Sequence, residues 1–457
     1  MNFRGKKIVV VGLGKSGIAA ARFLAREGAV VTALDSKPQA EMENAILSLK
    51  DVGVSLRFGG NDPAVISSSD MAVISPGVSP SLEGLEDICR RGGAVVGEME
   101  LAVGRIDRPI VAVTGTNGKT TTTSLIGHLL ENSGIRRVVA GNIGTPILDL
   151  VDDANRSDAV ILEVSSFQIE TTPSLAPKIS VLLNITPDHL DRHASFEEYA
   201  ECKGTLVKRT VADGFGIYNV RDALVSRIVR GATCSLIPFD AEGGSHLKSG
   251  SAASWFDGEA LMVSSGGGIT RKYSLEGISL EGVHNRENML AALTVCELLG
   301  ADSDLLLEGL KSFKGLPHRM ELVRDFDGVR YFNDSKGTNI GAVAKAISSL
   351  DAPIILIAGG ISKGVDFSPL SSLVEEKVKK LVLIGESCEE MSRIFEGIAD
   401  ITRASSMREA VLIAASVAEP GDVVLLSPAC ASFDMFRNYA DRGEQFAKCV
   451  MELADEK

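Results

Sequence analysis

Residues 109–127 read PIVAVTGTNGKTTTTSLIG. The apolar run at its start is typical of a buried strand, and the spacing of apolar residues after the turn is helical. The glycines between them let backbone N–H groups approach an anion at the positive end of the helix dipole. A lysine adds charge, and the next threonine offers a hydroxyl to Mg²⁺. We therefore predict a phosphate site formed by Gly115, Thr116, Asn117, Gly118, Lys119, Thr120 and Thr121.

This phosphate loop (residues 115–118) is tighter than the common pattern G-x-x-x-x-G-K-[ST]. Val113 stands where that pattern has its first glycine. A Gly-rich turn can also merely cap a helix. Here, however, strand, turn, lysine, hydroxyl and helix follow one another in the order that a phosphate site needs.

Composition places the chain among ordinary globular proteins. Its 457 residues exceed what one core usually supports, so we expect two to four domains. The net charge of −13 argues against nucleic-acid binding, because affinity for phosphates rests on clustered Lys and Arg. Seven scattered cysteines without a C-x-x-C pair suit reduced thiols. Without an export signal or an apolar segment of ~18 residues, a cytoplasmic protein with no membrane contact is expected.

Residues 7–35 predict a Rossmann-like unit of strand, Gly turn, helix and strand. The turn from Gly12 to Gly17 matches G-x-G-x-x-G, and Asp35 ends the second strand. Such glycines permit close approach of the backbone to a diphosphate, and the carboxylate can accept a ribose hydroxyl. The pattern predicts the fold more firmly than the ligand, because any nucleotide diphosphate with a ribose could use it. Farther along, Pro76 and Gly77 open a turn at a strand's C-terminal end.

Two segments after the phosphate loop carry candidate metal ligands. A strand predicted at 158–170 places Glu163 at the end of an apolar run, on the side where the phosphate loop opens, and a carboxylate there can bind Mg²⁺. His189 follows the next predicted strand and can serve as a ligand or a base, although lone histidines are more often structural. The helix after it carries Tyr199 and Lys203 on one face.

The remainder of the chain alternates predicted strands and helices again. A Gly/Ser-rich region at 241–268 predicts surface hairpins, and asparagines near 285 can cap a helix or read a purine edge. Beyond a linker at 315–323, βαβ repetition predicts a mainly parallel sheet. Lys336 and Lys363 follow two of its strands beside Gly turns, which predicts an anion site for a small carboxylate or a phosphate.

Seven motifs, in this order, resemble the Mur ligases of peptidoglycan synthesis. They are TGTNGKTTT at 114–122, EVSSFQ at 163–168, NITPDHLDRH at 184–193, HNRENMLAA at 284–292, GLPHRME at 315–321, NDSKGTN at 333–339 and SPACASFDMFRNYADRGEQF at 427–446. The resemblance implies an α/β fold of three domains. They are a Rossmann-like UDP-binding domain at 1–97, a central P-loop ATP-binding domain at 98–315 and a Rossmann-like amino-acid-binding domain at 316–457.

Within the family, the motifs are most similar to those of members that join D-glutamate to UDP-N-acetylmuramoyl-L-alanine. The resemblance implies a monomeric enzyme that transfers the ATP γ-phosphate to the substrate carboxylate and lets the D-glutamate amine attack the acyl phosphate. A carboxylate is a poor acyl donor until one oxygen becomes a phosphate leaving group. Such a transfer needs charge neutralisation and positioning more than a protein nucleophile.

The resemblance also implies a role for each matching residue. Lys119 would hold the β- and γ-phosphates, and two Mg²⁺ ions would be bound, one by Thr120 and Glu163 and one by His189 and a carbamylated Lys203. A bare ammonium beside Mg²⁺ would be repelled, whereas a carbamate offers oxygen. ATP would further contact Asn288, Arg319 and Asp334. The UDP-substrate would contact Gly14, Lys15, Asp35, Ser36, Lys37, Asn142 and His189, and D-glutamate would contact Lys336, Thr338, Lys363, Ser432, Phe433 and Tyr439.

Other classes of protein explain fewer of these features. A folylpolyglutamate synthetase does not account for the N-terminal Rossmann-like unit. A Mur ligase adding diaminopimelate or lysine would be expected to carry Asn-Pro-Arg in the third domain, where this chain has none. An NAD oxidoreductase leaves the phosphate loop without a role. A non-catalytic P-loop module gives Glu163, His189 and the paired lysines no purpose.

Overall fold

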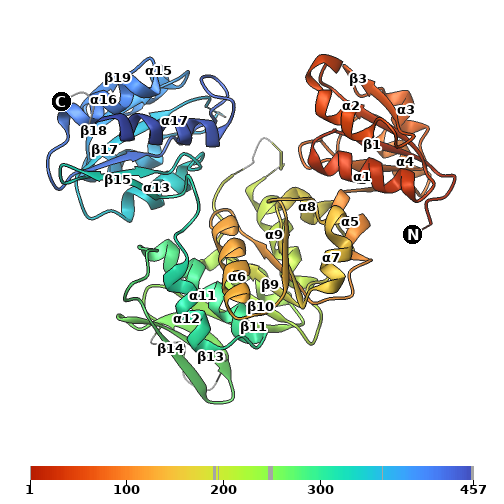
Figure 1. Cartoon of the computed structure of the whole chain (residues 1–457), viewed down its shortest axis with the longest axis horizontal. Coiled ribbons are helices and arrows are strands. Elements are labelled where there is room, and N and C mark those ends of the chain that lie inside the picture. Colours follow the sequence, from red (N-terminus) through yellow and green to blue (C-terminus); the bar gives the residue numbers. More distant parts are fainter. Residues whose placement is uncertain are drawn as a thin grey trace. The chain divides into compact units, whose positions relative to one another are not determined.

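Three β-sheets, each combined with helices, organise the chain in the computed structural model (Figure 1). The structure describes residues 2–188, 192–193, 195–244, 247, 251–362 and 364–453. In the colours of Figure 1 the first sheet is red, the second orange to green, and the third teal to blue. This architecture confirms the α/β fold class expected from the sequence.

The first sheet is parallel and has the strand order β3-β2-β1-β4-β5. Its strands are β1 (Lys7–Val11), β2 (Val30–Asp35), β3 (Ser55–Phe58), β4 (Met71–Ile74) and β5 (Ala94–Val96), with helices α1 (Lys15–Arg26), α2 (Glu43–Leu49), α3 (Pro63–Ser67), α4 (Leu85–Arg90) and α5 (Glu98–Val103). Strands β2 and β3 lie on one side of β1, whereas β4 and β5 lie on its other side, so the order of the strands reverses at β1. A crevice opens at such a reversal, and open α/β sheets bind their ligands there.

The second sheet has nine strands in the order β14-β13-β12-β11-β10-β9-β6-β8-β7. Its strands are β6 (Ile110–Thr114), β7 (Arg137–Gly141), β8 (Ala159–Glu163), β9 (Ile179–Leu182), β10 (Phe215–Asn219), β11 (Ser235–Asp240), β12 (Ala253–Phe256), β13 (Ala260–Gly266) and β14 (Ile269–Ser274). Strand β6 lies between β8 and β9 and parallel to both, so the segments after these three strands open at one edge.

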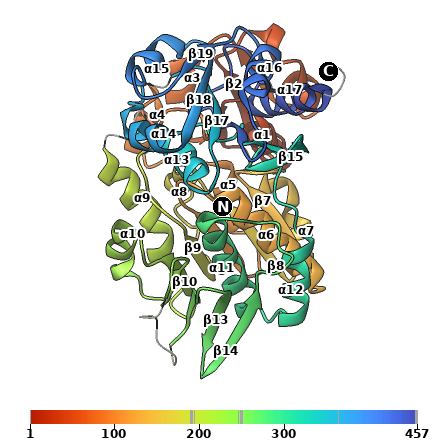
Figure 2. The same ribbon diagram turned by 90° about the vertical axis from the view of Figure 1, so that its left-hand side faces the viewer.

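Seven helices accompany this sheet in the described chain. They are α6 (Lys119–Asn132), α7 (Val151–Arg156), α8 (Ser166–Glu170), α9 (Phe196–Lys208), α10 (Ala223–Ile228), α11 (Val283–Leu298) and α12 (Ser303–Ser312). Figures 1 and 2 show α12 beside α6, and Gly309 of α12 lies against Leu129 of α6. A side chain at Gly309 would place its Cβ 2.8 Å from the Leu129 side chain, so the glycine allows the close approach.

Two sequence expectations for this region need correction or refinement. The strand predicted at 158–170 ends at Glu163, and the last five residues form α8. Ser165 and Gln168 make reciprocal hydrogen bonds as a capping box, which starts the helix and stops the strand. The hairpins expected at 241–268 extend the central sheet as antiparallel β12–β14, and the chain's single tryptophan, Trp255 on β12, packs over Gly244.

The third sheet has the order β15-β16-β20-β17-β18-β19 and is parallel apart from the β15–β16 hairpin. Its strands are β15 (Glu321–Phe326), β16 (Val329–Asn333), β17 (Ile354–Gly359), β18 (Val378–Ile384), β19 (Ile401–Arg403) and β20 (Val423–Leu426), with helices α13 (Ile340–Ser348), α14 (Ser371–Lys377), α15 (Cys388–Ile394), α16 (Met407–Val417) and α17 (Tyr439–Met451). The mainly parallel sheet predicted for this region is therefore present.

The chain divides into two compact units. The first comprises residues 1–276 and 287–312, and the second comprises residues 277–286 and 313–457. The first two sheets belong to the first unit, where Val10 of β1 and Leu162 of β8 belong to one hydrophobic cluster. The boundary between Arg286 and Glu287 falls inside α11.

Helix α11, with 16 residues, is the longest helix that the structure describes. Across the described ranges, a helix with the length and apolar character needed to cross a membrane is absent.

Candidate functional site

The phosphate loop joins β6 to α6, as the sequence predicts. Gly115 and Gly118 have φ angles of +148° and +86°, which side-chain-bearing residues rarely adopt. A Cβ on Gly118 would lie 2.5 Å from Oδ1 of Asn288. Asn288 is buried and accepts a hydrogen bond of 3.0 Å from the Thr122 hydroxyl. The structure thus places Asn288, a predicted ATP contact, directly against the loop.

Asn184 holds the shape of the phosphate loop. Its Oδ1 accepts from the Asn117 amide at 2.8 Å, its Nδ2 donates to the Asn117 carbonyl at 3.1 Å, and its own carbonyl accepts from the Thr116 amide at 2.9 Å. Sequence reasoning missed this residue. The available signal was its position just after β9, at the same sheet edge as the loop.

Two lysine side chains converge on one carbonyl of the loop. Lys119 Nζ donates to the carbonyls of Gly115 and Thr116 at 2.8 Å each, and Lys203 Nζ donates to that of Gly115 at 2.9 Å. Burial, together with the nearby charge of Lys119, holds the pKa of Lys203 well below the usual lysine range. Tyr199 lies beneath Lys203 and is buried, as expected of a packing residue, and its hydroxyl is 3.1 Å from Thr116 Oγ1.

Glu163 lies at the end of β8 and is almost completely buried. Its Oε1 accepts a hydrogen bond of 2.8 Å from Asn142 Nδ2, whereas its buried Oε2 has no hydrogen-bond partner among the described residues. A buried carboxylate oxygen without a donor is costly unless a cation fills that role, and Mg²⁺ prefers oxygen ligands of this kind. The residues therefore fit Mg²⁺, with Thr120 at the start of α6 as the second predicted ligand.

Two predicted site residues, His189 and Lys363, lie outside the described residues. Their places in the site stay predictions from the sequence.

A pocket of about 450 Å³ opens at the C-terminal ends of β1, β2 and β4. Asp35 shapes it by accepting from the amides of Leu13 at 2.7 Å and Lys37 at 2.9 Å. The pocket is lined by the predicted residues Gly14, Lys15, Asp35, Ser36 and Lys37, and also by Gly12, Ser16, Asn61, Ser75, Pro76, Gly77 and Val78. Sequence reasoning missed Asn61, whose buried Oδ1 lacks a hydrogen-bond partner among the described residues and which belongs to no recognisable pattern.

A second pocket of about 220 Å³ adjoins the first through Lys15, Ser16 and Pro76. Asn142 lines it from the central sheet. The structure thereby brings Asn142, predicted as a substrate contact, beside Lys15 on the one hand and Glu163 on the other.

In the second unit, Asp334 is buried at the end of β16. Burial raises the pKa of its carboxyl to about 7, although a hydrogen bond from Ser427 and the charge of Arg319 act in the opposite direction. The Ser427 hydroxyl donates to Asp334 Oδ2 at 2.7 Å. Asp334 therefore lies close to Arg319, another predicted ATP contact.

Two of the residues predicted to bind D-glutamate, Lys336 and Tyr439, are in contact. Lys336 Nζ lies 3.7 Å from the centre of the Tyr439 ring, which is a cation–π contact. Thr338 donates its amide to the Lys336 carbonyl at 2.8 Å, and Ser432 is buried. Phe433 is 70% exposed, so its ring is not part of the core.

Arg442 on α17 is completely buried and was missed by sequence reasoning. It donates to the hydroxyl and the carbonyl of Ser335, at 3.0 and 2.8 Å, and to the Cys430 carbonyl at 3.2 Å. It thus ties together the segments that follow β16 and β20. Burial lowers its pKa to about 10. In the sequence, Arg442 is one of several charged residues in a segment whose pattern is typical of a surface helix, so nothing local indicates that it is buried.

Family models match most of the chain. The model described as "Mur ligase MurD-like, N-terminal domain" matches residues 6–97, "Mur ligase middle domain" matches 113–296, and "Mur ligase, glutamate ligase domain" matches 318–430. The chain belongs to the Mur ligase family. The resemblance expected from the sequence is confirmed, and this Mur ligase is accordingly an ATP-dependent enzyme that forms amide bonds.

Relatives match this Mur ligase over nearly its whole length. A protein named UDP-N-acetylmuramoylalanine–D-glutamate ligase from Geobacter sp. (strain M21) is 43% identical over 450 residues, which are 98% of each chain. Pseudomurein peptide ligase type C from Methanothermus fervidus has a TM-score of 0.62 at 20% identity, covering 98% of this chain and 100% of that one. MurF ligase from Thermotoga maritima, solved in complex with ADP, has a TM-score of 0.59 at 18% identity, covering 99% and 96%. The two structural likenesses show the fold alone.

Proposed function

We propose that this Mur ligase joins D-glutamate to UDP-N-acetylmuramoyl-L-alanine, with ATP converted to ADP and phosphate by way of an acyl phosphate. The observation that carries the proposal is the 43% identity, over 98% of both chains, to a relative named for this reaction. The match of residues 318–430 to a domain described as a glutamate ligase domain supports the same acceptor.

The phosphate loop supports the role of ATP. The start of α6 offers backbone N–H donors to phosphate oxygens, whereas the amides of Thr116 and Asn117 are held by Asn184. Lys119 now donates to the carbonyls of Gly115 and Thr116, and a bound phosphate would offer its ammonium a charged acceptor instead. Mg²⁺ held by Glu163 and Thr120 would supply positive charge that neutralises the phosphates. The support for that ion is the unpartnered, buried Oε2 of Glu163.

Lys203 is proposed to carry a carbamate. Its lowered pKa favours the neutral amine, and the neutral form has the lone pair that attacks CO₂. The amine nitrogen then forms a bond to the carbon of CO₂ and loses a proton, which converts the buried neutral amine into an anionic carbamate that offers oxygen ligands. Together with His189, that oxygen would hold a second Mg²⁺.

The sites proposed for the UDP-substrate and for D-glutamate also place lysine side chains where an anionic group would bind. The 450 Å³ pocket offers Lys15 and Lys37 to the diphosphate of the UDP-substrate, so an acidic protein meets an anion with local positive charge. In the second unit, Lys336 is proposed to bind a carboxylate of D-glutamate, with Ser432 and Thr338 as further polar contacts. Lys363 stays a predicted member of this set.

We further propose that the enzyme works as a monomer in the cytoplasm. Its product would be consumed in building peptidoglycan, and its activity would therefore support cell shape and division.

The deciding experiment measures phosphate release with Mg²⁺, ATP and UDP-N-acetylmuramoyl-L-alanine. D-Glutamate is compared with L-glutamate, diaminopimelate and L-alanine as the acceptor. Release with D-glutamate alone is expected. Release with another amino acid would move the protein to a different step of the pathway, and no release with any of them would contradict the proposal. Added hydroxylamine, which converts acyl phosphates to hydroxamates, tests the intermediate.

The carbamate has its own test. Lys203→Ala is expected to lose most activity and to regain part of it when short-chain carboxylates are added, because they can return an oxygen ligand to the vacated space. Lys208→Ala, an exposed lysine near the end of the same helix, is the matched control and should neither lose activity nor respond to carboxylates. A Lys203→Ala variant without rescue argues against the carbamate.

A further inference from the structure

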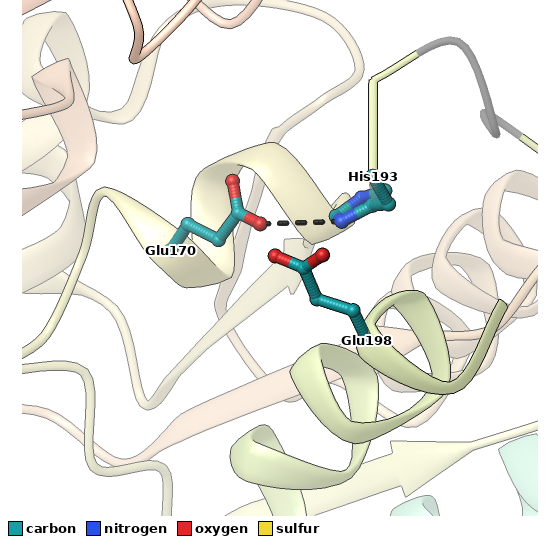
Figure 3. Close-up of side chains that lie close together, drawn as sticks. All are labelled: Glu170, His193 and Glu198. Atoms are coloured by element: carbon teal, nitrogen blue, oxygen red, sulfur yellow. Dashed lines mark ion pairs between the residues drawn. The ribbon is translucent and has the colours of Figure 1, made fainter. Parts of the chain in front are cut away.

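Glu170, His193 and Glu198 converge from three separate segments of the first unit (Figure 3). Glu170 is the last residue of α8, Glu198 lies in the first turn of α9, and His193 precedes α9. In Figure 3 both carboxylates point toward the imidazole. The possible ligand atoms of the three residues all lie within 4.8 Å of one another. None of these residues has a role in the proposed ligase reaction.

The imidazole of His193 is fixed so that one nitrogen faces the two carboxylates. Its Nε2 lies 3.0 Å from the Ser166 hydroxyl, and its ring stacks on Phe167 and meets the edge of Tyr199. His193 is only 4% exposed, so the ring has little freedom to turn. Histidines that bind metals are usually held in this way by a hydrogen bond at the second ring nitrogen.

The distances in the cluster suit a small cation. Nδ1 of His193 lies 3.3 Å from Oε1 of Glu170. Two ligand atoms on one ion, each at about 2.0–2.2 Å, lie roughly 3 to 3.5 Å apart when they subtend a tetrahedral or octahedral angle. Glu198 is exposed, and its carboxylate belongs to the same group of possible ligand atoms, all within 4.8 Å of one another. A cation there would also offset the repulsion between the two carboxylates.

We propose that Glu170, His193 and Glu198 bind one divalent transition-metal ion of the Zn²⁺ and Co²⁺ class, with water completing its coordination. The imidazole nitrogen favours such ions over Mg²⁺, which prefers oxygen. This site is distinct from the predicted Mg²⁺ site, which is built on Glu163. The ion links α8 to α9, the helix whose Lys203 contacts the phosphate loop.

The experiment uses the full chain, stripped of metal with a chelator and then titrated with Co²⁺ in excess Mg²⁺. Visible absorption and equilibrium dialysis report the binding. We expect one Co²⁺ per chain at this site, with affinity lowered at least about ten-fold in His193→Gln and in Glu198→Gln. His128→Gln is the matched control. His128 lies on α6 and bonds to Gly309 and Ser312, so its replacement should leave Co²⁺ binding unchanged.

A second variant separates this site from the Mg²⁺ site. Glu163→Gln should retain the Co²⁺ absorption that His193→Gln loses. The opposite pattern would assign the ion to Glu163 and overturn the proposal. Wild-type protein that binds no Co²⁺ would also overturn it and would leave His193 as an ion-paired side chain. If His193→Gln does not fold, as judged by circular dichroism, the exposed Glu198→Gln decides in the same way.

Discussion

Gly118 is a single position at which both backbone and packing demand glycine. We expect Gly118→Ala to weaken ATP binding at least ten-fold, because the new Cβ would lie 2.5 Å from Asn288 Oδ1 and displace the side chain that lies against the loop. Isothermal titration with ATP measures the loss. Gly134→Ala is the matched control, because its φ of +72° carries similar strain while its Cβ would have open space. It should cost about 1 kcal/mol of stability and leave ATP affinity unchanged. Equal ATP affinity in both variants would contradict the argument.

The buried carboxyl group of Glu98 should make the stability of the folded state depend on pH. The residue is buried at the start of α5, where its carboxylate accepts the Leu148 amide at 2.6 Å. Burial raises its pKa from 4.5 to about 7. The folded state therefore holds the proton more tightly than the unfolded state, so the stabilising contribution is complete below pH 4.5 and is lost as pH rises through 7. The loss amounts to at most about 3 kcal/mol.

Glu98→Gln keeps an oxygen for the Leu148 amide and removes the titration. We expect its melting temperature relative to the wild type to rise between pH 5 and 8. Glu86→Gln, at an exposed position of α4, is the control and should show no such trend. A constant difference between Glu98→Gln and the wild type across this range would be the contrary result.

At this scale the sequence predicts those site residues that belong to a local pattern. Lys119 follows β6 and Glu163 ends β8, both in recognisable motifs, and the structure brings both to one edge of the central sheet. Asn184 and Arg442 act through contacts with residues distant in the chain. Such contacts depend on how strands and helices are paired in space, so a local pattern does not contain them. Asn184 could be suspected from its strand end, whereas Arg442 could not.

Helix α9 shows how one glycine sets the position of a whole element. A Cβ on Gly204 would lie 1.9 Å from Cγ2 of Ile228 on α10, so Gly204→Ala must push the two helices apart. Because the neighbouring residue is Lys203, we expect a loss of activity as well as of stability. Overpacking of this kind typically costs about 1–3 kcal/mol.

The double variant Gly204→Ala with Ile228→Ala tests this packing. Removal of the Ile228 side chain frees the space that the new methyl group needs, so the double variant should be more active than Gly204→Ala alone. Chemical denaturation of both single variants and the double variant gives the coupling energy. Strictly additive effects would show that the two positions do not share this space.

For strands and helices, the residues at turns and caps determine whether the sequence predicts the ends of an element correctly. Apolar runs ending in glycine predicted β6 and the loop after it correctly. The apolar run predicts that the strand continues past Glu163, but Ser165 and Gln168 carry the S-x-x-Q spacing of a capping box. That signal was present in the sequence and outweighs the strand-like composition around it. The extension of the central sheet by β12–β14 could not be predicted, because pairing with β11 is a long-range contact.

For the whole molecule, the two compact units predict two unfolding transitions. Phe446 is fully buried in a hydrophobic cluster drawn from the second unit, and Phe446→Ala should cost about 3–5 kcal/mol there. Calorimetry should show one transition moving to lower temperature while the other stays. Leu129→Ala, in the buried core of the first unit, is the reciprocal variant and should move the other transition. A single transition that moves with both variants would show that the units unfold together.

The single tryptophan, on β12, restricts intrinsic tryptophan fluorescence to one of the two units. All tryptophan emission comes from Trp255 in the first unit, so the second unit can melt without a change in that emission. In Phe446→Ala, the midpoint of a fluorescence melt should therefore stay with the wild type, while the ellipticity at far-ultraviolet wavelengths falls earlier. The intrinsic fluorescence of Trp255 therefore reports the unfolding of the unit that contains the phosphate loop and not that of the second unit.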